Sequence, residues 1–161
     1  TSFGMFSIVP ADLDDPRVIA MIQTHVSRAR AETAPCSAHA LDLSGLKSPD
    51  VSVWTMWADN ALVGTGALKR LSPDHGEVKS TYTDLAYRRR GAGRVIVEHI
   101  IAAAQDAGLE RLSLETGSAP YFQPAVALYR SRGFVDCQPF GTYVLDPNSV
   151  FMTLVLTSGS A

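Results

Sequence analysis

The apolar residues of the chain change their spacing at Gly93, and this change constrains the fold more than any other feature. Before Gly93, residues 51–58, 61–71 and 77–83 read as three consecutive strands, separated by turn-forming residues such as Asp59 and Asn60. After Gly93, apolar residues recur with the period of a helix. They are Ile96, Val97, Ile100, Ile101 and Ala104. A meander of strands that runs into an amphipathic helix predicts a sheet with that helix packed against it.

The rest of the chain continues this alternation of strands and helices. A first strand is expected at residues 5–9, and a helix should follow Asp15 and Pro16 and run to about Ala31. Residues 32–50 have no clean period and read as a loop with a short helical piece. The C-terminal third adds a strand, a short helix and one or two closing strands, at 111–115, 124–133, 134–137 and 149–156. This order predicts an α/β or α+β domain with a mixed sheet.

The length and charge of the chain limit the kinds of partner that it can have. A chain of 161 residues suits a single domain, here taken as 1–161. The formal net charge is −2 and the pI is near 6.0, so no general attraction to nucleic acid or to an anionic membrane is expected. No apolar run approaches the roughly 20 residues of a membrane span. Any anion site must therefore be local.

The cysteines and the N-terminus indicate a cytoplasmic protein. Cys36 and Cys137 lie about a hundred positions apart, without CxxC or Cys/His spacing, which favours free thiols over a disulfide or a metal site. The first residues lack a basic start followed by an apolar run, so no signal peptide is predicted. We expect no bound metal.

Local positive charge is concentrated in YRRRGAGR, residues 87–94, between a predicted strand and the start of the periodic helix. Backbone N–H groups and the helix dipole favour an anion there, and glycines at positions 91 and 93 let the backbone approach a phosphate. A P-loop is excluded because no Lys-Ser/Thr pair follows, and Ile96 replaces the third glycine of the dinucleotide motif. A nucleic-acid surface fits poorly because basic and aromatic residues do not extend over a face. A pyrophosphate fits best.

These residues resemble a known family. Arg88, Gly91 and Gly93 match the (Q/R)xxGx(G/A) motif of the GCN5-related N-acetyltransferases, and ALYRSRGF at 127–134 resembles the ALYxxxGF segment of that family. Other stretches, such as GALKRLSPDHGEVKS, are similar to a small bacterial branch with mostly undefined acceptors. The resemblance implies a mostly antiparallel central sheet flanked by helices, and acetyl-CoA as co-substrate.

The resemblance also implies which residues hold the coenzyme. Backbone amides of the glycine-containing turn bind its pyrophosphate, and an extended pantetheine arm pairs with the end of the strand before the turn. At least one of the arginines should point to solvent. The expected coenzyme-binding residues are Tyr82, Thr83, Arg88, Arg89, Arg90, Gly91, Ala92, Gly93 and Arg94.

Two catalytic residues are expected from the same resemblance. Glu77 lies 14 positions before Gly91, where histone-acetylating members carry their general base, although it also reads as an edge carboxylate beside Lys79. Tyr129 matches the tyrosine that protonates the departing thiolate, and its alternative role is core packing. Phe122 departs from the family, which often has asparagine there, so one usual hydrogen bond to the coenzyme is in doubt.

The acceptor side is defined less sharply. His39 in the long loop, His75 before Glu77 and Glu115 at a strand end are candidates to line an acceptor pocket, and each histidine also reads as a solvated loop residue. Trp54 and Trp57 should lie on opposite faces of their strand, one in the core and the other bordering the acceptor cleft.

The leading hypothesis is an acetyl-CoA-dependent N-acetyltransferase that acts on a primary amine of a small molecule or peptide, by direct transfer in a ternary complex. The alternatives are a silent acyl-CoA-binding sensor or interaction module, and a phosphate-binding or nucleic-acid-binding domain. The expected partners are acetyl-CoA and an amine, with neither nucleic acid nor a membrane. A homodimer through the C-terminal strands is compatible with the sequence.

Overall fold

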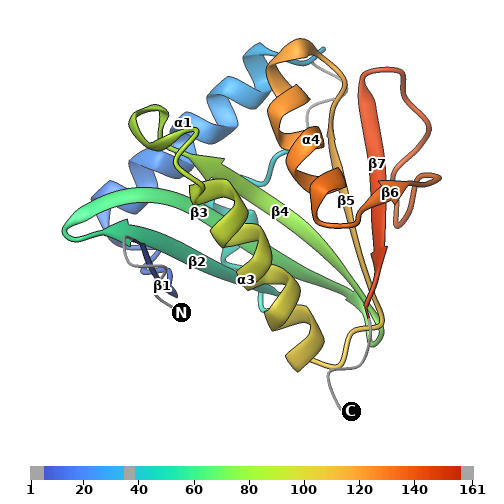
Figure 1. The fold of residues 1–161 in the computed structure, drawn as a ribbon, viewed down its shortest axis with the longest axis horizontal. Coiled ribbons are helices and arrows are strands. Elements are labelled where there is room, and N and C mark those ends of the chain that lie inside the picture. Colours follow the sequence, from blue (N-terminus) through green and yellow to red (C-terminus); the bar gives the residue numbers. More distant parts are fainter. Residues whose placement is uncertain (1–5, 35–38, 157–161) are drawn as a thin grey trace.

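The computed structural model describes residues 6–34 and 39–156 (Figure 1). The strands and helices follow one another in an alternating order. They are β1 (Ser7–Pro10), α1 (Pro16–Ala31), α2 (Leu43–Leu46), β2 (Val51–Ala58), β3 (Ala61–Ser72), β4 (His75–Thr83), η2 (Leu85–Tyr87), α3 (Ala92–Asp106), β5 (Arg111–Gly117), η3 (Pro120–Phe122), α4 (Gln123–Ser131), β6 (Val135–Asp136) and β7 (Ser149–Val155).

The seven strands form one sheet in the order β1-β2-β3-β4-β5-β7-β6. Every neighbouring pair is antiparallel except β4 and β5, which run parallel. The expectation of a mixed, mostly antiparallel sheet flanked by helices is confirmed. The parallel pair needs a crossover, and α3 supplies it.

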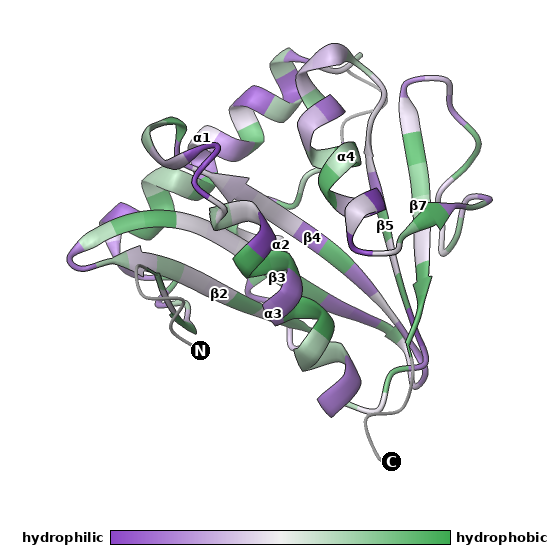
Figure 2. Cartoon of the chain, in the orientation of Figure 1, coloured by the Kyte–Doolittle hydropathy of each residue, from purple (hydrophilic) through white to green (hydrophobic). Residues whose placement is uncertain are grey.

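Helices cover both faces of the sheet, and each face has its own apolar cluster (Figures 1 and 2). The larger cluster joins α3 and α4 to the sheet through residues such as Ile96, Ile100 and Met152. The smaller cluster joins α1 and α2 to the other face through Ile22 of α1 and Leu46 of α2. The period of α3 puts its apolar residues on one side, so the helix packs along β3 and β4.

The helix starts follow from local chemistry. Pro16 occupies the first turn of α1, and the Asp15 side chain accepts a hydrogen bond from the Arg17 backbone N–H. Helix α3 begins differently, because its N-cap is Gly91 in the left-handed region with φ 82° and no side chain caps the first turn. The first amides of α3 are therefore left to other acceptors.

The short pairing between β4 and β5 opens the sheet. Only three residue pairs join the two strands: His75 with Arg111, Gly76 with Leu112, and Glu77 with Ser113. Beyond them β4 runs on to Thr83 and β5 to Gly117 without pairing to one another. The strands diverge from this point, and a cleft opens between them.

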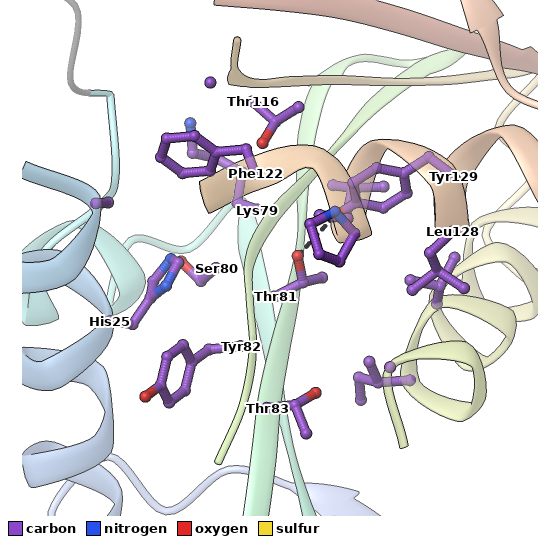
Figure 3. A pocket seen from close by; sticks show the side chains of 18 of the residues that line it. His25, Lys79, Ser80, Thr81, Tyr82, Thr83, Thr116, Phe122, Leu128 and Tyr129 are labelled. Carbon is purple, nitrogen blue, oxygen red and sulfur yellow. Dashed lines mark hydrogen bonds between the residues drawn. The ribbon is translucent and has the colours of Figure 1, made fainter. Parts of the chain in front are cut away.

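A bulge in β4 changes the faces to which its last residues point. Lys79 pairs with Ala67 and Tyr82 with Thr65, so two residues of β4, Ser80 and Thr81, lie opposite a single residue of β3. Ser80 has a positive φ of 56°. As a result Tyr82 shares the face of Lys79, toward α1, while Thr81 points to the opposite face, toward α4 (Figure 3).

Most predicted elements are confirmed, and the differences have local causes. The helical piece in the 32–50 loop is α2. Strand β4 begins at His75 and not at residue 77, because Ser72 pairs with His75 and the turn consists of two residues. Cys36 lies outside the described residues, and Cys137 is a free thiol.

The two tryptophans lie on opposite faces as predicted, because each packs on a different helix. Trp54 meets His99 of α3 edge-on, with ring centroids 5.0 Å apart, and the Arg17 guanidinium of α1 lies over the Trp57 ring. The expectation that one of them borders the acceptor cleft is wrong, since neither lines the cleft.

A glycine in β3 allows α3 to pack closely on the sheet, and its replacement should destabilise the fold. A Cβ at Gly66 would lie 2.7 Å from Ile96 Cγ1 and 2.9 Å from Ile100 Cδ1. Overpacking of this kind costs roughly 1–3 kcal/mol, so Gly66→Ala should lower the free energy of unfolding by that amount in urea titrations. The control is Gly93→Ala, where the nearest atom is a mobile Leu128 methyl at 3.1 Å and helix propensity favours alanine. An unchanged midpoint for Gly66→Ala would contradict the packing argument.

Candidate active site

The cleft between β4 and β5 encloses about 560 Å³ (Figure 3). Its walls come from four parts of the chain: the end of β4, the end of β5, the start of α3 with the segment before it, and α4. Residues from α1 and from the loop after it close the remaining side. The lining residues include His25, His39, Lys79, Ser80, Thr81, Tyr82, Thr83, Arg88, Arg89, Gly91, Ala92, Gly93, Arg94, Glu115, Phe122 and Tyr129.

One end of the cleft is suited to an anion. The N-terminus of α3 faces it, and its first amides have no side-chain cap, so they present positive partial charge. A Cβ at Gly93 would point toward Leu128 and the Thr83 hydroxyl, while one at Gly91 would meet no atom within 4 Å. Backbone groups of the turn are therefore accessible from the cleft.

The arginines of the same segment differ in position. Arg88, Arg89 and Arg94 line the cleft, whereas Arg90 lies outside the lining with its guanidinium over the Tyr87 ring. Arg88 donates to the Thr83 carbonyl at 3.3 Å and lies between the Tyr82 and Tyr121 rings. Arg94 forms an ion pair with Glu98 at 2.9 Å. Three of the four arginines thus lie at this end, where Glu98 compensates the charge of Arg94.

Tyr129 lies at the middle of the cleft, on α4. Its hydroxyl shares a hydrogen bond of 2.6 Å with Thr81 Oγ1, which the β4 bulge turns toward it. The residue is 4% exposed, and burial raises the pKa of its phenol above the ordinary value. Tyr129 is therefore protonated at neutral pH and holds its proton at the surface of the cleft.

Phe122 lies at the rim, where the family often has asparagine. A Cβ at Gly117 would come within 2.2 Å of the Phe122 ring, so the ring packs directly on the end of β5. The position supplies an apolar wall and no hydrogen bond.

Glu77 lies behind the cleft wall and not in the lining. The residue is 3% exposed, and its Oε2 accepts hydrogen bonds from the Tyr143 hydroxyl at 2.6 Å and from Lys79 Nζ at 3.2 Å. Burial and the nearby Glu77 charge raise the pKa of Tyr143. The carboxylate that the spacing indicates as a base is thus tied into a buried ion pair.

Glu115 is the carboxylate that lines the cleft. It is on β5, two residues beyond the last residue paired with β4. Burial raises the pKa of Glu115 above its ordinary value, and the Glu77 charge acts in the same direction, while His39 and Lys79 oppose the change. A carboxylate with a raised pKa in a cleft is suited to accept a proton near neutral pH.

The predicted histidines have separate positions. His39 lines the cleft and meets the Tyr143 ring edge-on, with centroids 5.0 Å apart. His75 does not line it. Its Nε2 shares a hydrogen bond of 2.7 Å with the buried Ser113 hydroxyl, at the closed root of the β4–β5 pair.

Three residues of this site were missed by the sequence reasoning as functional candidates. Lys79 was noted only as a neighbour of Glu77, and Tyr143 lies in an irregular segment whose fold no pattern predicts. His25 is on α1, where its position next to the apolar stripe was the only available signal. Its ring centroid is 5.5 Å from that of Tyr82 on β4, which points toward α1 (Figure 3).

The described residues contain no group of three His, Cys, Asp or Glu side chains arranged to hold a metal ion. None of the helices within 6–34 and 39–156 has the length and apolar character that crossing a membrane requires.

By its fold, with a sheet that splits beside an uncapped helix N-terminus, the chain falls into the class of acyl-CoA acyltransferases. The chain belongs to the acetyltransferase (GNAT) family, whose model matches residues 19–134. The prediction of an acetyl-CoA-dependent acetyltransferase is confirmed by this membership and by the curated relatives.

Two curated bacterial proteins and one solved structure are similar over nearly the whole chain. The uncharacterized N-acetyltransferase YedL of Escherichia coli is 45% identical over 152 residues, which are 94% of this chain and 96% of the relative. The uncharacterized N-acetyltransferase YsnE of Bacillus subtilis is 44% identical over 142 residues, 88% of this chain and 94% of the relative. A provisionally named acyl-CoA N-acyltransferase from Klebsiella pneumoniae superposes with a TM-score of 0.80 at 28% identity, covering 95% of this chain and 99% of its own.

The half-buried histidine of the cleft, His25, should make the protein sensitive to acid. Burial lowers the pKa of His25 from 6.5 to about 4, so the folded state binds this proton less readily than the unfolded state. Stability from the neutral ring is present above pH 6.5 and is lost as the pH falls toward 4. When the pH is lowered from 7.5 to 5, the wild type should lose about 2 kcal/mol more of its free energy of unfolding than His25→Gln does. Urea unfolding at the two pH values measures both losses. Equal losses in both proteins would show that His25 titrates normally.

Proposed function

We propose that the protein transfers the acetyl group of acetyl-CoA directly to a primary amine of a small molecule or peptide, with both substrates bound together. One observation carries this proposal: a single cleft has an uncapped helix N-terminus at one end, the Tyr129 hydroxyl in its middle and the Glu115 carboxylate on its wall. These are the groups that thioester aminolysis requires, in one continuous space.

The donor is held at the α3 end. The coenzyme pyrophosphate accepts hydrogen bonds from the first amides of α3, and Arg88, Arg89 and Arg94 add positive charge. The pantetheine arm lies along β4 beyond Glu77, where that strand has no partner on the β5 side, and pairs with its backbone. A backbone N–H of this stretch stabilises the oxyanion as the thioester carbonyl is attacked.

The reaction forms one bond and breaks another within this space. The amine nitrogen attacks the thioester carbonyl carbon, a C–N bond forms, and the C–S bond then breaks to release the coenzyme thiolate. Tyr129 gives its phenolic proton to that thiolate, because it is protonated and lies within the cleft. The nitrogen loses its second proton as the amide forms, and this proton restores the Tyr129 phenol. The net products are the acetylated amine, free coenzyme A and the proton that the base took from the ammonium.

Two carboxylates are candidates to remove the proton of the acceptor ammonium. Sequence spacing favours Glu77, which acts only through Tyr143 or a water, because its carboxylate is hydrogen-bonded behind the wall. Position favours Glu115, which lines the cleft and has a raised pKa. We assign the direct role to Glu115 and a supporting role to Glu77.

Coenzyme binding can be tested apart from turnover. Coenzyme A at 100 times its dissociation constant should stabilise the protein by about 2.7 kcal/mol, visible as an upward shift of the melting temperature. Gly91→Val should weaken binding about tenfold, because Gly91 has a φ of 82°, which a β-branched residue adopts only with strain, so the turn that presents the first amides of α3 must shift. The absence of any shift at saturating coenzyme would refute the proposal, whereas binding without turnover of any amine would favour the silent sensor.

Turnover of single-site variants distinguishes the proposed roles. Thiol release should fall about 10²–10⁴-fold in Glu115→Gln and Tyr129→Phe, the range typical of general acid–base catalysis. Glu77→Gln should lose less than Glu115→Gln. In the wild type, kcat/KM should rise with pH as Glu115 ionises, above the ordinary glutamate range because its pKa is raised. Greater loss in Glu77→Gln than in Glu115→Gln would return the base role to Glu77.

A further inference from the structure

Lys79 lines the cleft, yet its ammonium group has no N–H left for a substrate. The side chain is 9% exposed, and Nζ donates to Glu77 Oε2 at 3.2 Å, to the Tyr143 hydroxyl at 2.9 Å and to the His39 carbonyl at 3.4 Å. An ammonium has three N–H donors, and all three are used. Binding a substrate carboxylate would require at least one of these bonds to break.

The charge balance on this side of the cleft is negative. Glu77 compensates Lys79 through their ion pair, whereas Glu115 forms no ion pair with any described residue. The His25 ring is neutral at pH 7, because burial lowers its pKa to about 4. Besides Lys79, the lysines and arginines that line the cleft are Arg88, Arg89 and Arg94, and these lie at the end assigned to the pyrophosphate. Among the described residues on this side of the cleft, the acceptor therefore meets one carboxylate without an ion pair and no lysine or arginine with an unused N–H.

We propose that the acceptor is an amine without a carboxylate beside its amino group, and that Lys79 is the positioning residue that sets this selectivity. The inference rests on the proposed function and narrows its substrate class. A simple amine brings one positive charge to Glu115, with the rings of His25 and Tyr82 beside its carbon chain. An α-amino acid brings a carboxylate that finds no partner and is repelled by Glu115.

Matched substrates test the proposal. Each set contains an amine, the α-amino acid that differs from it by the carboxylate, and the methyl ester of that amino acid: tryptamine, tryptophan and its ester, and likewise for tyramine and histamine. Thiol release is measured at pH 8, where histidine side chains are in general neutral. In each set, kcat/KM for the amine and for the ester should exceed that for the amino acid at least tenfold. The ester keeps the bulk of the amino acid and loses its charge, so it separates repulsion from size.

Two variants should change this ratio. Tyr143→Phe removes one acceptor from the Lys79 ammonium and frees an N–H, so the preference for amine over amino acid should fall at least fivefold. Glu115→Gln removes the repelling charge and should also lower the ratio, even though total turnover falls. Tyr87→Phe is the control, because that ring packs under Arg90 outside the cleft. Its ratio should match the wild type.

The outcomes separate this inference from the proposed function. A coenzyme A melting shift with equal or better turnover of the amino acids would overturn the inference and leave the acetyltransferase proposal intact. A melting shift with no turnover of any amine would also overturn it, because its positive claim is a cationic amine acceptor. Loss of the melting shift itself would refute the proposed function and the inference together.

Discussion

The short parallel pairing of β4 and β5 is the constraint on which the site depends. Three residue pairs hold the strands together. A chain of side-chain hydrogen bonds lies at the closed end of the opening, where His75 shares a hydrogen bond with Ser113, and Ser113 shares one with Thr153 at 2.9 Å. Had the ladder continued, β4 beyond Glu77 would have no free edge and the cleft would not exist. The backbone that can receive the pantetheine arm is available because the ladder stops there.

The bulge in β4 determines to which face of the sheet the side chains along this edge point. Without it, Thr81 would share the face of Lys79, because residues two apart point the same way along a strand. The inserted residue, Ser80 with its positive φ, moves Thr81 to the face of Tyr129 and Tyr82 to the face of His25. The cleft therefore has a different set of side chains on each side, with the Tyr129 hydroxyl on one and the rings of His25 and Tyr82 on the other.

Features that depend on neighbouring residues could be predicted from the sequence, whereas contacts between residues far apart in the sequence could not. The period of α3, the glycines at its start and the meander before it are written in neighbouring residues, so the element order and the anion end could be predicted. Tyr143 and Glu77 are 66 positions apart, and no spacing rule joins them. The sequence did not indicate His25 as a site residue for a similar reason, since its contact with the Tyr82 ring depends on the bulge that turns Tyr82 toward α1. The missed contacts are long-range, between segments without periodic patterns.

For Glu77 and Glu115, the distance along the sequence from the glycine motif and the position in the sheet indicate different residues as the carboxylate of the cleft. Counting back from Gly91 leads to Glu77, but Glu77 is the last residue of β4 that pairs with β5, so it lies where the strands are still joined. Ser113 is its partner, and Glu115 lies two residues further along β5, on the same face and just past the point of divergence. A side chain at that point faces the opening, while Glu77 is left to neutralise Lys79 behind it. Which carboxylate lines the cleft is therefore decided by where the parallel ladder ends, and sequence distance from the glycine motif does not contain that information.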